Sequence, residues 1–130
     1  MSRLVEKVPH IGKNKANEYT YFDYYNTCAD CTLIFSVEGF DFSKDVDLYV
    51  NFGSSKGFPT KEKNDFASEE WTVETLTIKP NEGMFAKKRS MKGLFLIAVS
   101  SEVETSFMIQ VESLEHEVEK LHKHKEKKIT

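Results

Sequence analysis

Cysteine and proline are scarce in this sequence, with two cysteines and three prolines among 130 residues. Two cysteines are too few for a disulfide-rich scaffold or a four-cysteine zinc site. No segment approaches the roughly 20 consecutive apolar residues that a membrane-spanning helix needs, so we expect no membrane association. Charged residues from Arg3 onward interrupt the N-terminus before a signal-peptide core can develop. The sequence predicts a cytoplasmic protein if the chain is complete, and an extracellular domain if it is excised from a longer one.

An excess of basic charge is also missing. The chain has 18 lysines and arginines against 21 aspartates and glutamates, which gives a formal net charge of −3. A dedicated nucleic-acid-binding protein would gather a basic excess on one face, so we expect no nucleic-acid partner. The sequence also lacks the Gly-x-Ser-x-Gly, His-Glu-x-x-His and phosphate-loop motifs. We therefore predict that the protein is not an enzyme.

What the sequence does contain is the pattern of a β protein of one domain. Hydrophobic residues make up 39% of the chain and aromatic residues 12%, enough for a single core. Apolar residues alternate with polar ones in several short segments, which is typical of strands with one buried face. The predicted strands are 18–25, 32–37, 46–52, 71–78, 93–99 and 107–111. We predict an all-β, antiparallel, jelly-roll-like β-sandwich of about six to eight strands, followed by a charged C-terminal helix.

Two details of strand pairing also follow from the pattern. The apolar alternation between Val73 and Leu76 slips by one residue, which fits a β-bulge. The last two strands are separated by a polar connection that begins at Ser100. This short connection predicts a hairpin near the centre of a sheet.

The chain divides into three parts by composition. Residues 1–17 are rich in lysine and asparagine and predict an N-terminal arm or linker with at most a short edge strand. Residues 18–112 hold the strand pattern and form the predicted sandwich domain. Residues 113–130 are highly charged and predict an amphipathic helical tail.

The helical prediction for the tail depends on one apolar stripe. Leu114, Val118 and Leu121 are spaced at i, i+4 and i+7, so they lie on one face of a helix. Ser113 is suited to cap the N-terminus of that helix. A stripe this narrow makes a marginal helix in isolation, and it could pack on the sandwich, bind a partner or fray.

Five segments in order resemble the bacterial pre-peptidase C-terminal (PPC) domain. The most specific of them is Asp45-Val46-Asp47-Leu48-Tyr49-Val50, and the resemblance covers roughly residues 18 to 112. The other segments are 19–22, 31–39, 93–99 and 107–111. The resemblance implies a jelly-roll sandwich of the kind usually secreted and attached to proteases. It also raises calcium binding, because related collagen-binding modules bind calcium.

Three aspartates are the candidate metal ligands. Asp45 and Asp47 lie at i and i+2 at the start of a predicted strand, with Asp41 close by, and could offer oxygen ligands to calcium. The alternative is structural, with Asp45 capping the turn and Asp47 accepting hydrogen bonds from loop amides. The run from Asp47 to Val50 also faintly resembles part of C2 domains, which implies calcium-dependent or lipid binding.

The long polar segment from Gly53 to Glu70 and the strand after it carry the candidate partner-binding aromatics. These residues are Phe58, Phe66 and Trp71. Loops this long are uncommon unless they carry function or irregular packing. The three rings could be exposed anchors for a partner or plugs over the open end of the core.

Cys28 and Cys31 form a lone Cys-x-x-Cys pair between two predicted strands. A redox pair of the thioredoxin type would begin a helix, whereas Cys31 leads directly into a strand. Ordinary turn cysteines or a local disulfide both remain open, and neither metal nor redox chemistry is favoured.

These features predict a noncatalytic binding or accessory module that recognises protein or polysaccharide through loop or sheet-face aromatics. A second hypothesis is a structural assembly component that docks through Leu114, Val118 and Leu121. A third is a C2-like calcium- and lipid-binding module. Calcium is the only cofactor that the sequence suggests.

Overall fold

The computed structural model describes residues 1–41, 45–69 and 73–115, and these residues form nine strands and one short 3₁₀ helix. The elements are β1 (Ser2–Arg3), β2 (His10–Asn14), β3 (Tyr19–Asn26), β4 (Thr32–Gly39), β5 (Val46–Phe52), β6 (Phe66–Ser68), β7 (Val73–Ile78), η1 (Gly83–Phe85), β8 (Gly93–Ser101) and β9 (Thr105–Leu114).

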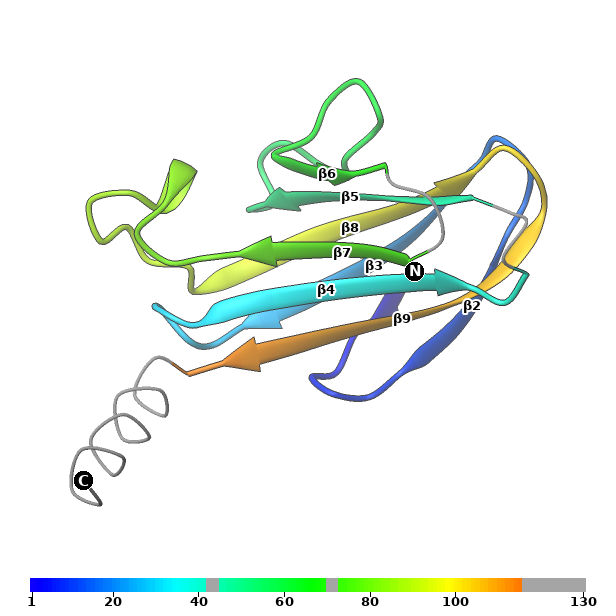
Figure 1. Cartoon of the computed structure of the whole chain (residues 1–130). Helices are drawn as coiled ribbons and strands as arrows, with labels where there is room; N and C mark the ends of the chain where they lie inside the picture. Colours follow the sequence, from blue (N-terminus) through cyan, green and yellow to red (C-terminus); the bar gives the residue numbers. More distant parts are fainter. Residues whose placement is uncertain (42–44, 70–72, 116–130) are drawn as a thin grey trace, which may run out of the picture.

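The strands form two sheets that face each other (Figure 1). One sheet has the order β1-β3-β8-β5-β6, and the other has the order β2-β9-β4-β7. Among the described strands, β1 and β3 are the one parallel pair, and the other pairs are antiparallel. From β2 to β9 the strand order is that of an eight-stranded jelly roll. The predicted all-β, mainly antiparallel sandwich is therefore confirmed.

Period-two alternation places the core between the sheets. Along β4, residues alternate strictly between half-buried and buried positions, with Leu33, Phe35 and Val37 fully buried. On the facing sheet, Leu48 of β5 and Ile97 of β8 are also inaccessible to solvent. Side chains at alternate positions of a strand point to the same face, so these residues meet in one apolar layer.

Strand β8 is buried on both faces because the long segment after β5 covers the outer one. Ile97 belongs to the core between the sheets, yet its neighbours Leu96 and Ala98 are also buried. Tyr49 of β5 lies opposite Ala98 of β8 and is inaccessible to solvent as well. The covering segment is the loop 53–65, which explains why the sequence of β8 is apolar at nearly every position.

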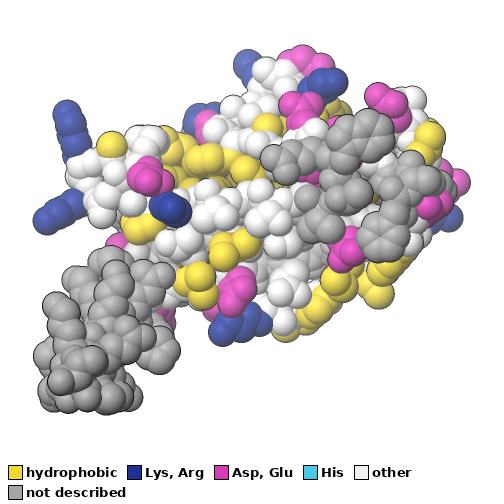
Figure 2. Space-filling view, in the orientation of Figure 1, with side chains coloured by type: hydrophobic (Ala, Val, Ile, Leu, Met, Phe, Trp, Pro, Cys, Tyr) yellow, Lys and Arg dark blue, Asp and Glu magenta, His cyan; other side chains and the backbone are white. Residues whose placement is uncertain are grey.

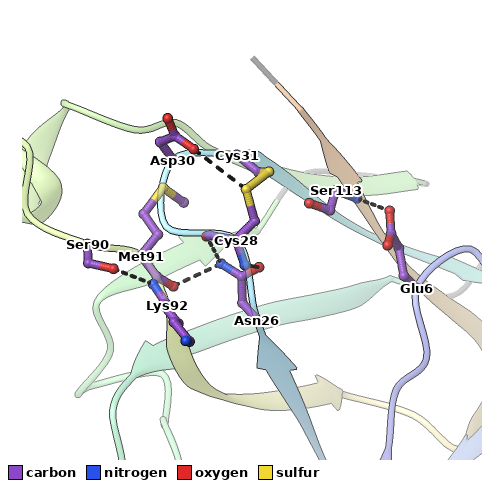
Figure 3. The surroundings of a disulfide bond; sticks show 9 residues. All are labelled: Glu6, Asn26, Cys28, Asp30, Cys31, Ser90, Met91, Lys92 and Ser113. Atoms are coloured by element: carbon purple, nitrogen blue, oxygen red, sulfur yellow. Dashed lines mark hydrogen bonds between the residues drawn. A yellow bond between two sulfur atoms is a disulfide. The ribbon is translucent and has the colours of Figure 1, made fainter. Parts of the chain in front are cut away.

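The end of the sandwich where β3 turns into β4 is closed by a disulfide and by apolar side chains. Cys28 and Cys31 form the disulfide, so the local bridge is the form adopted by this pair (Figure 3). Asn26 Nδ2 donates hydrogen bonds to the carbonyl oxygens of Cys28 and Met91, each at 2.9 Å. Nearby, the Phe85 ring of η1 packs 4.9 Å from the Phe52 ring at the end of β5. Met91 and Phe85 are 0% and 1% exposed, so this end is sealed.

The predicted bulge in β7 is wrong. Residues 73–78 pair one to one with β4, from Val73 opposite Glu38 to Ile78 opposite Leu33. The buried side chain that replaces the expected apolar one is Glu74, which is 0% exposed. Because Glu74 occupies an inward-facing position, the hydrophobic pattern lacks an apolar residue there. This gap in the pattern was wrongly interpreted as a bulge.

The predicted hairpin of the last two strands is also wrong. β8 pairs with β3 and β5, whereas β9 pairs with β2 and β4. The connection after Ser101 thus carries the chain from one sheet to the other. Each strand is flanked on both sides within its own sheet.

Strand β9 extends two residues into the segment that the sequence assigned to the helical tail. Ser113 and Leu114 are the last residues of β9 and pair with Leu33 and Thr32 of β4, so Ser113 is not a helix cap. The Ser113 amide instead donates to Glu6 Oε1 at 3.1 Å. The described residues end at 115, so the rest of the predicted helix, with Val118 and Leu121, lies outside them.

The N-terminal segment contributes to both sheets, through β1 and β2, rather than at most one edge strand. Arg3 makes two hydrogen bonds to the Asp23 carboxylate, at 3.1 and 3.0 Å, and Leu4 is 3% exposed. In β2, a Cβ at Gly12 would lie 2.6 Å from Cζ of Phe107. Glycine is therefore required where this edge strand crosses the Phe107 ring.

On the face seen in Figure 2, acidic and basic side chains lie in scattered positions among polar ones, and hydrophobic side chains form one broad patch in the upper middle and smaller patches elsewhere. Within the described residues, no helix has the length and apolar character to cross a membrane.

Candidate functional site

Three carboxylates converge at the end of the sandwich opposite the disulfide. Asp45 immediately precedes β5, Asp47 is the second residue of β5, and Glu74 is the second residue of β7. The two strands belong to different sheets but begin at the same end (Figure 1). One oxygen atom from each of the three residues lies within 4.8 Å of the other two.

Burial and mutual repulsion make this cluster costly to ionise. Burial raises the pKa of Asp47 to about 6, and the charges of Asp45, Glu74 and Glu69 add to the effect. The Lys61 ammonium opposes this rise. The pKa of Asp45 is also raised, first by burial and then by Glu102, against a hydrogen bond from the Val46 amide. Charges of one sign in a poorly solvated place favour protonation or a bound cation.

The oxygen atoms of the cluster are only partly used by the protein. Ser68 Oγ donates a hydrogen bond to Glu74 Oε2. Asp45 Oδ1 and Asp47 Oδ1 are buried, and neither has a hydrogen-bond donor among the described residues. Buried polar atoms normally have a partner, and hard oxygen atoms converging in this way suit a divalent cation such as calcium.

The sequence identified two of these three residues. Asp45 and Asp47 come together as anticipated, whereas the third candidate, Asp41, is exposed and is not part of the cluster. The sequence analysis did not single out Glu74, because it lies on a strand far from Asp45 and Asp47 in the sequence. Its spacing of two and four residues from Leu76 and Ile78 would have placed it on the inward face.

A second feature lies on the outer face of the sheet that contains β3. Tyr19 and Tyr21, two residues apart on β3, stack with ring centroids 6.0 Å apart and ring planes at 14°. The Phe58 ring, from loop 53–65, lies 4.6 Å from the Tyr21 ring and is 36% exposed. The three rings form a continuous row, which we call the aromatic row.

Loop 53–65 holds a pocket of about 490 Å³ beside the aromatic row. Phe58 contributes to its lining together with side chains that can form hydrogen bonds. These include Asn51, Ser55, Lys56, Thr60 and Lys63. The volume is within the range of small-ligand sites.

The remaining predicted partner-binding residues lie in other places. Phe66 of β6 stacks on Phe85 with centroids 6.4 Å apart and packs against the core. Leu114, at the end of β9, is 37% exposed. Trp71, Val118 and Leu121 lie outside the described residues.

At the level of sequence, no protein-family model and no curated protein matches this chain. Solved structures do match the fold. The PPC domain of a collagenase from Bacillus anthracis superposes with a TM-score of 0.61 at 8% identity, covering 86% of this chain and 95% of that domain.

Two further structures share the architecture. The surface-associated copper-binding protein CorA of Methylomicrobium album BG8 matches with a TM-score of 0.55 and 5% identity, over 86% of this chain and 97% of that one. PliG of Aeromonas hydrophila, a periplasmic inhibitor of g-type lysozyme, matches with a TM-score of 0.52 and 11% identity, over 85% and 96%.

These comparisons define the class of fold. The resemblance to the PPC domain that the sequence predicted is confirmed for the fold, and it spans most of both chains. Identities this low establish architecture, whereas function depends on the individual site.

Proposed function

We propose that this chain is a noncatalytic binding or accessory module for a protein or polysaccharide ligand, and that Asp45, Asp47 and Glu74 bind one calcium ion. The β-sandwich supplies a rigid support, and the ion would fix the end of the sandwich where β5 and β7 begin. The three named structural neighbours, a PPC domain, an inhibitor and a copper-binding protein, support a binding role.

The observation that carries the calcium proposal is the convergence of three carboxylates from two sheets. A calcium ion takes six to eight oxygen ligands, and carboxylates, backbone carbonyls and water supply them in flexible geometry. The cluster offers carboxylate oxygens within 4.8 Å of one another, including two buried atoms with no hydrogen-bond donor in the described chain. A bound dication would offset the burial and the mutual repulsion that together raise the pKa of Asp47.

The test is thermal unfolding of the protein with excess calcium and with chelator. A ligand that binds only the folded state stabilises it by about 2.7 kcal/mol at a hundredfold excess over its dissociation constant. We expect calcium to raise the unfolding temperature of the wild type, and we expect Asp47→Asn and Glu74→Gln to lose most of that rise.

The matched control is Glu82→Gln, because Glu82 is an exposed acidic residue in the turn before η1. This variant should keep the full calcium response. Absence of any response in the wild type, or an undiminished response in Asp47→Asn, would rule out calcium binding at this cluster.

We also propose an oxidising compartment, either extracellular or periplasmic, as the place where the module works. The support is the Cys28–Cys31 disulfide, since such bonds persist mainly outside the reducing cytosol. The unreduced protein should contain no titratable thiol when it is isolated from that compartment, which thiol labelling in denaturant would measure.

A further inference from the structure

The aromatic row and the pocket beside it form one surface on the outer face of the sheet. Tyr19 and Tyr21 are half-buried, so part of each ring is accessible, and Phe58 extends the row into loop 53–65. A partly exposed aromatic ring presents a flat apolar face to a ligand, while the buried part of the ring is held in place by its neighbours. A flat apolar surface beside hydroxyl, amide and ammonium groups suits a sugar ring, which has apolar faces and a polar rim.

The loop is held against the sheet by hydrogen bonds that do not depend on a ligand. The Lys61 amide donates to the Tyr19 hydroxyl at 3.0 Å. Asn51 Nδ2 donates to the Gly57 carbonyl at 3.0 Å, and Asn51 Oδ1 accepts from the Asp65 amide at 2.9 Å. The Phe52 amide donates to Asp65 Oδ2 at 2.9 Å. A surface that is ordered before binding loses less entropy when a ligand arrives.

The charge of the pocket is opposite to that of the whole chain. Its lining includes two lysines, Lys56 and Lys63, and one acidic residue, Asp65. Lys56 Nζ is paired with Asp65 Oδ1 at 2.6 Å. Among the described residues Lys63 Nζ has no carboxylate partner within 4.0 Å, so it leaves a positive charge in a protein whose formal net charge is −3.

We propose that this surface binds an acidic polysaccharide, with sugar rings stacked on Phe58 and Tyr21 and a sugar carboxylate paired with Lys63. Ser55 and Thr60 line the same pocket, and their hydroxyl groups would form hydrogen bonds with the sugar hydroxyls. This inference rests on the proposed binding function and names its ligand class, but it does not depend on calcium at Asp45, Asp47 and Glu74.

The experiment is calorimetric titration of the whole chain with a galacturonic acid hexamer, in chelator so that calcium cannot bridge protein and sugar. A neutral glucose hexamer and a poly-glutamate peptide of similar length serve as comparison ligands. We expect the uronate to bind at least about tenfold more tightly than either, which corresponds to about 1.4 kcal/mol. Added salt should weaken the binding, because a charge pair at the surface is screened.

Variants locate the site. Phe58→Ala should weaken uronate binding by at least about tenfold, as expected for a stacked aromatic anchor. Lys63→Gln should weaken it several-fold and reduce the preference over the neutral hexamer. Tyr25→Ala is the matched control, because Tyr25 is 50% exposed on β3 but makes no ring contact with the aromatic row among the described residues. It should bind as the wild type does.

Four outcomes would overturn the proposal: no uronate binding at millimolar concentration, equal binding of the neutral hexamer, equal binding of poly-glutamate, or unchanged affinity in both Phe58→Ala and Lys63→Gln. Lys63→Gln changes only an exposed side chain, so it stays informative if Phe58→Ala unfolds. The calcium response is measured separately, so failure here is distinguishable from failure of the calcium proposal.

Discussion

The two ends of the sandwich are built in opposite ways. At one end a disulfide, the Phe85 ring and Met91 close the core with covalent and apolar contacts. At the other end Asp45, Asp47 and Glu74 bring like charges together. The first arrangement stabilises the fold directly, whereas the second adds a cost that a proton or a cation removes. The disulfide end thus stabilises the fold by itself, and the acidic end is the place where we propose that calcium binds.

The same contrast is visible in how polar groups are used. At the disulfide end, the Asn26 amide donates to two backbone carbonyls, and its Oδ1 accepts from the Cys28 amide. At the acidic end, buried oxygen atoms of Asp45 and Asp47 have no donor among the described residues. A satisfied buried polar group rigidifies its surroundings, whereas an unsatisfied one costs free energy until a proton, a water molecule or an ion becomes its partner.

The largest expected effect is at the closed end. Phe85→Ala removes a fully buried ring that contacts Phe52, Phe66 and Phe95. We expect a loss of about 3–5 kcal/mol in the free energy of unfolding, because a cavity replaces the ring. Urea denaturation measures this, with Phe40→Ala, an exposed phenylalanine, as the control. A loss below about 1 kcal/mol would show that this end is not sealed by the Phe85 ring.

The disulfide should have the next largest effect. It closes a short loop, since Cys28 and Cys31 are three residues apart. The chain-entropy relation gives about 2 kcal/mol of stabilisation for a loop of this size. Denaturation of the oxidised and reduced protein should differ by about this amount, with the same calcium response in both. A calcium response that disappears on reduction would contradict the independence of the two ends.

The smallest expected effect is the pH dependence of the acidic end. The pKa of Asp47 is about 6 in the folded protein, above its ordinary value of 3.8. The folded state therefore holds this proton more tightly, so the stability that Asp47 contributes is fully present below about pH 4 and is lost as the pH rises through about 6. Allowing for partial exposure, we expect Asp47 to account for a loss of about 1–2 kcal/mol.

This pH effect is measured as the difference between wild type and Asp47→Asn in urea denaturation at several pH values in chelator. Subtracting the variant removes the contribution of other carboxylates. Saturating calcium should remove the difference in slope by holding Asp47 ionised. A wild-type protein that gains stability relative to Asp47→Asn as the pH rises from about 4 to 6 would contradict the assignment.

The sequence predicted the sandwich because most strands show period-two alternation. The strand predicted at 46–52 coincides with β5, and the pair Asp45 and Asp47 was found because the two residues lie at the start of this strand. Local pattern is sufficient for these features, since each is defined within a few residues.

Features that depend on distant contacts could not be predicted. Glu74 joins the cluster only because β7 begins beside β5 in the other sheet. β8 is the central strand of its sheet, as its apolar sequence indicated, but no local pattern reveals that loop 53–65 lies over its outer face. The assignment of β8 and β9 to different sheets likewise follows from their partners and not from the short connection between them.

The pairing of β2 with β9 has a consequence for how the chain acquires its structure. His10 lies opposite Ile109, so one of the first strands to be synthesised pairs with the last one described. Strand pairs so far apart in sequence close late and make folding slow. During synthesis on the ribosome, β2 has no partner until β9 emerges. A ribosome-bound chain of which only the residues before Thr105 have emerged should therefore be digested readily by protease. A longer chain in which β9 has also emerged should be resistant.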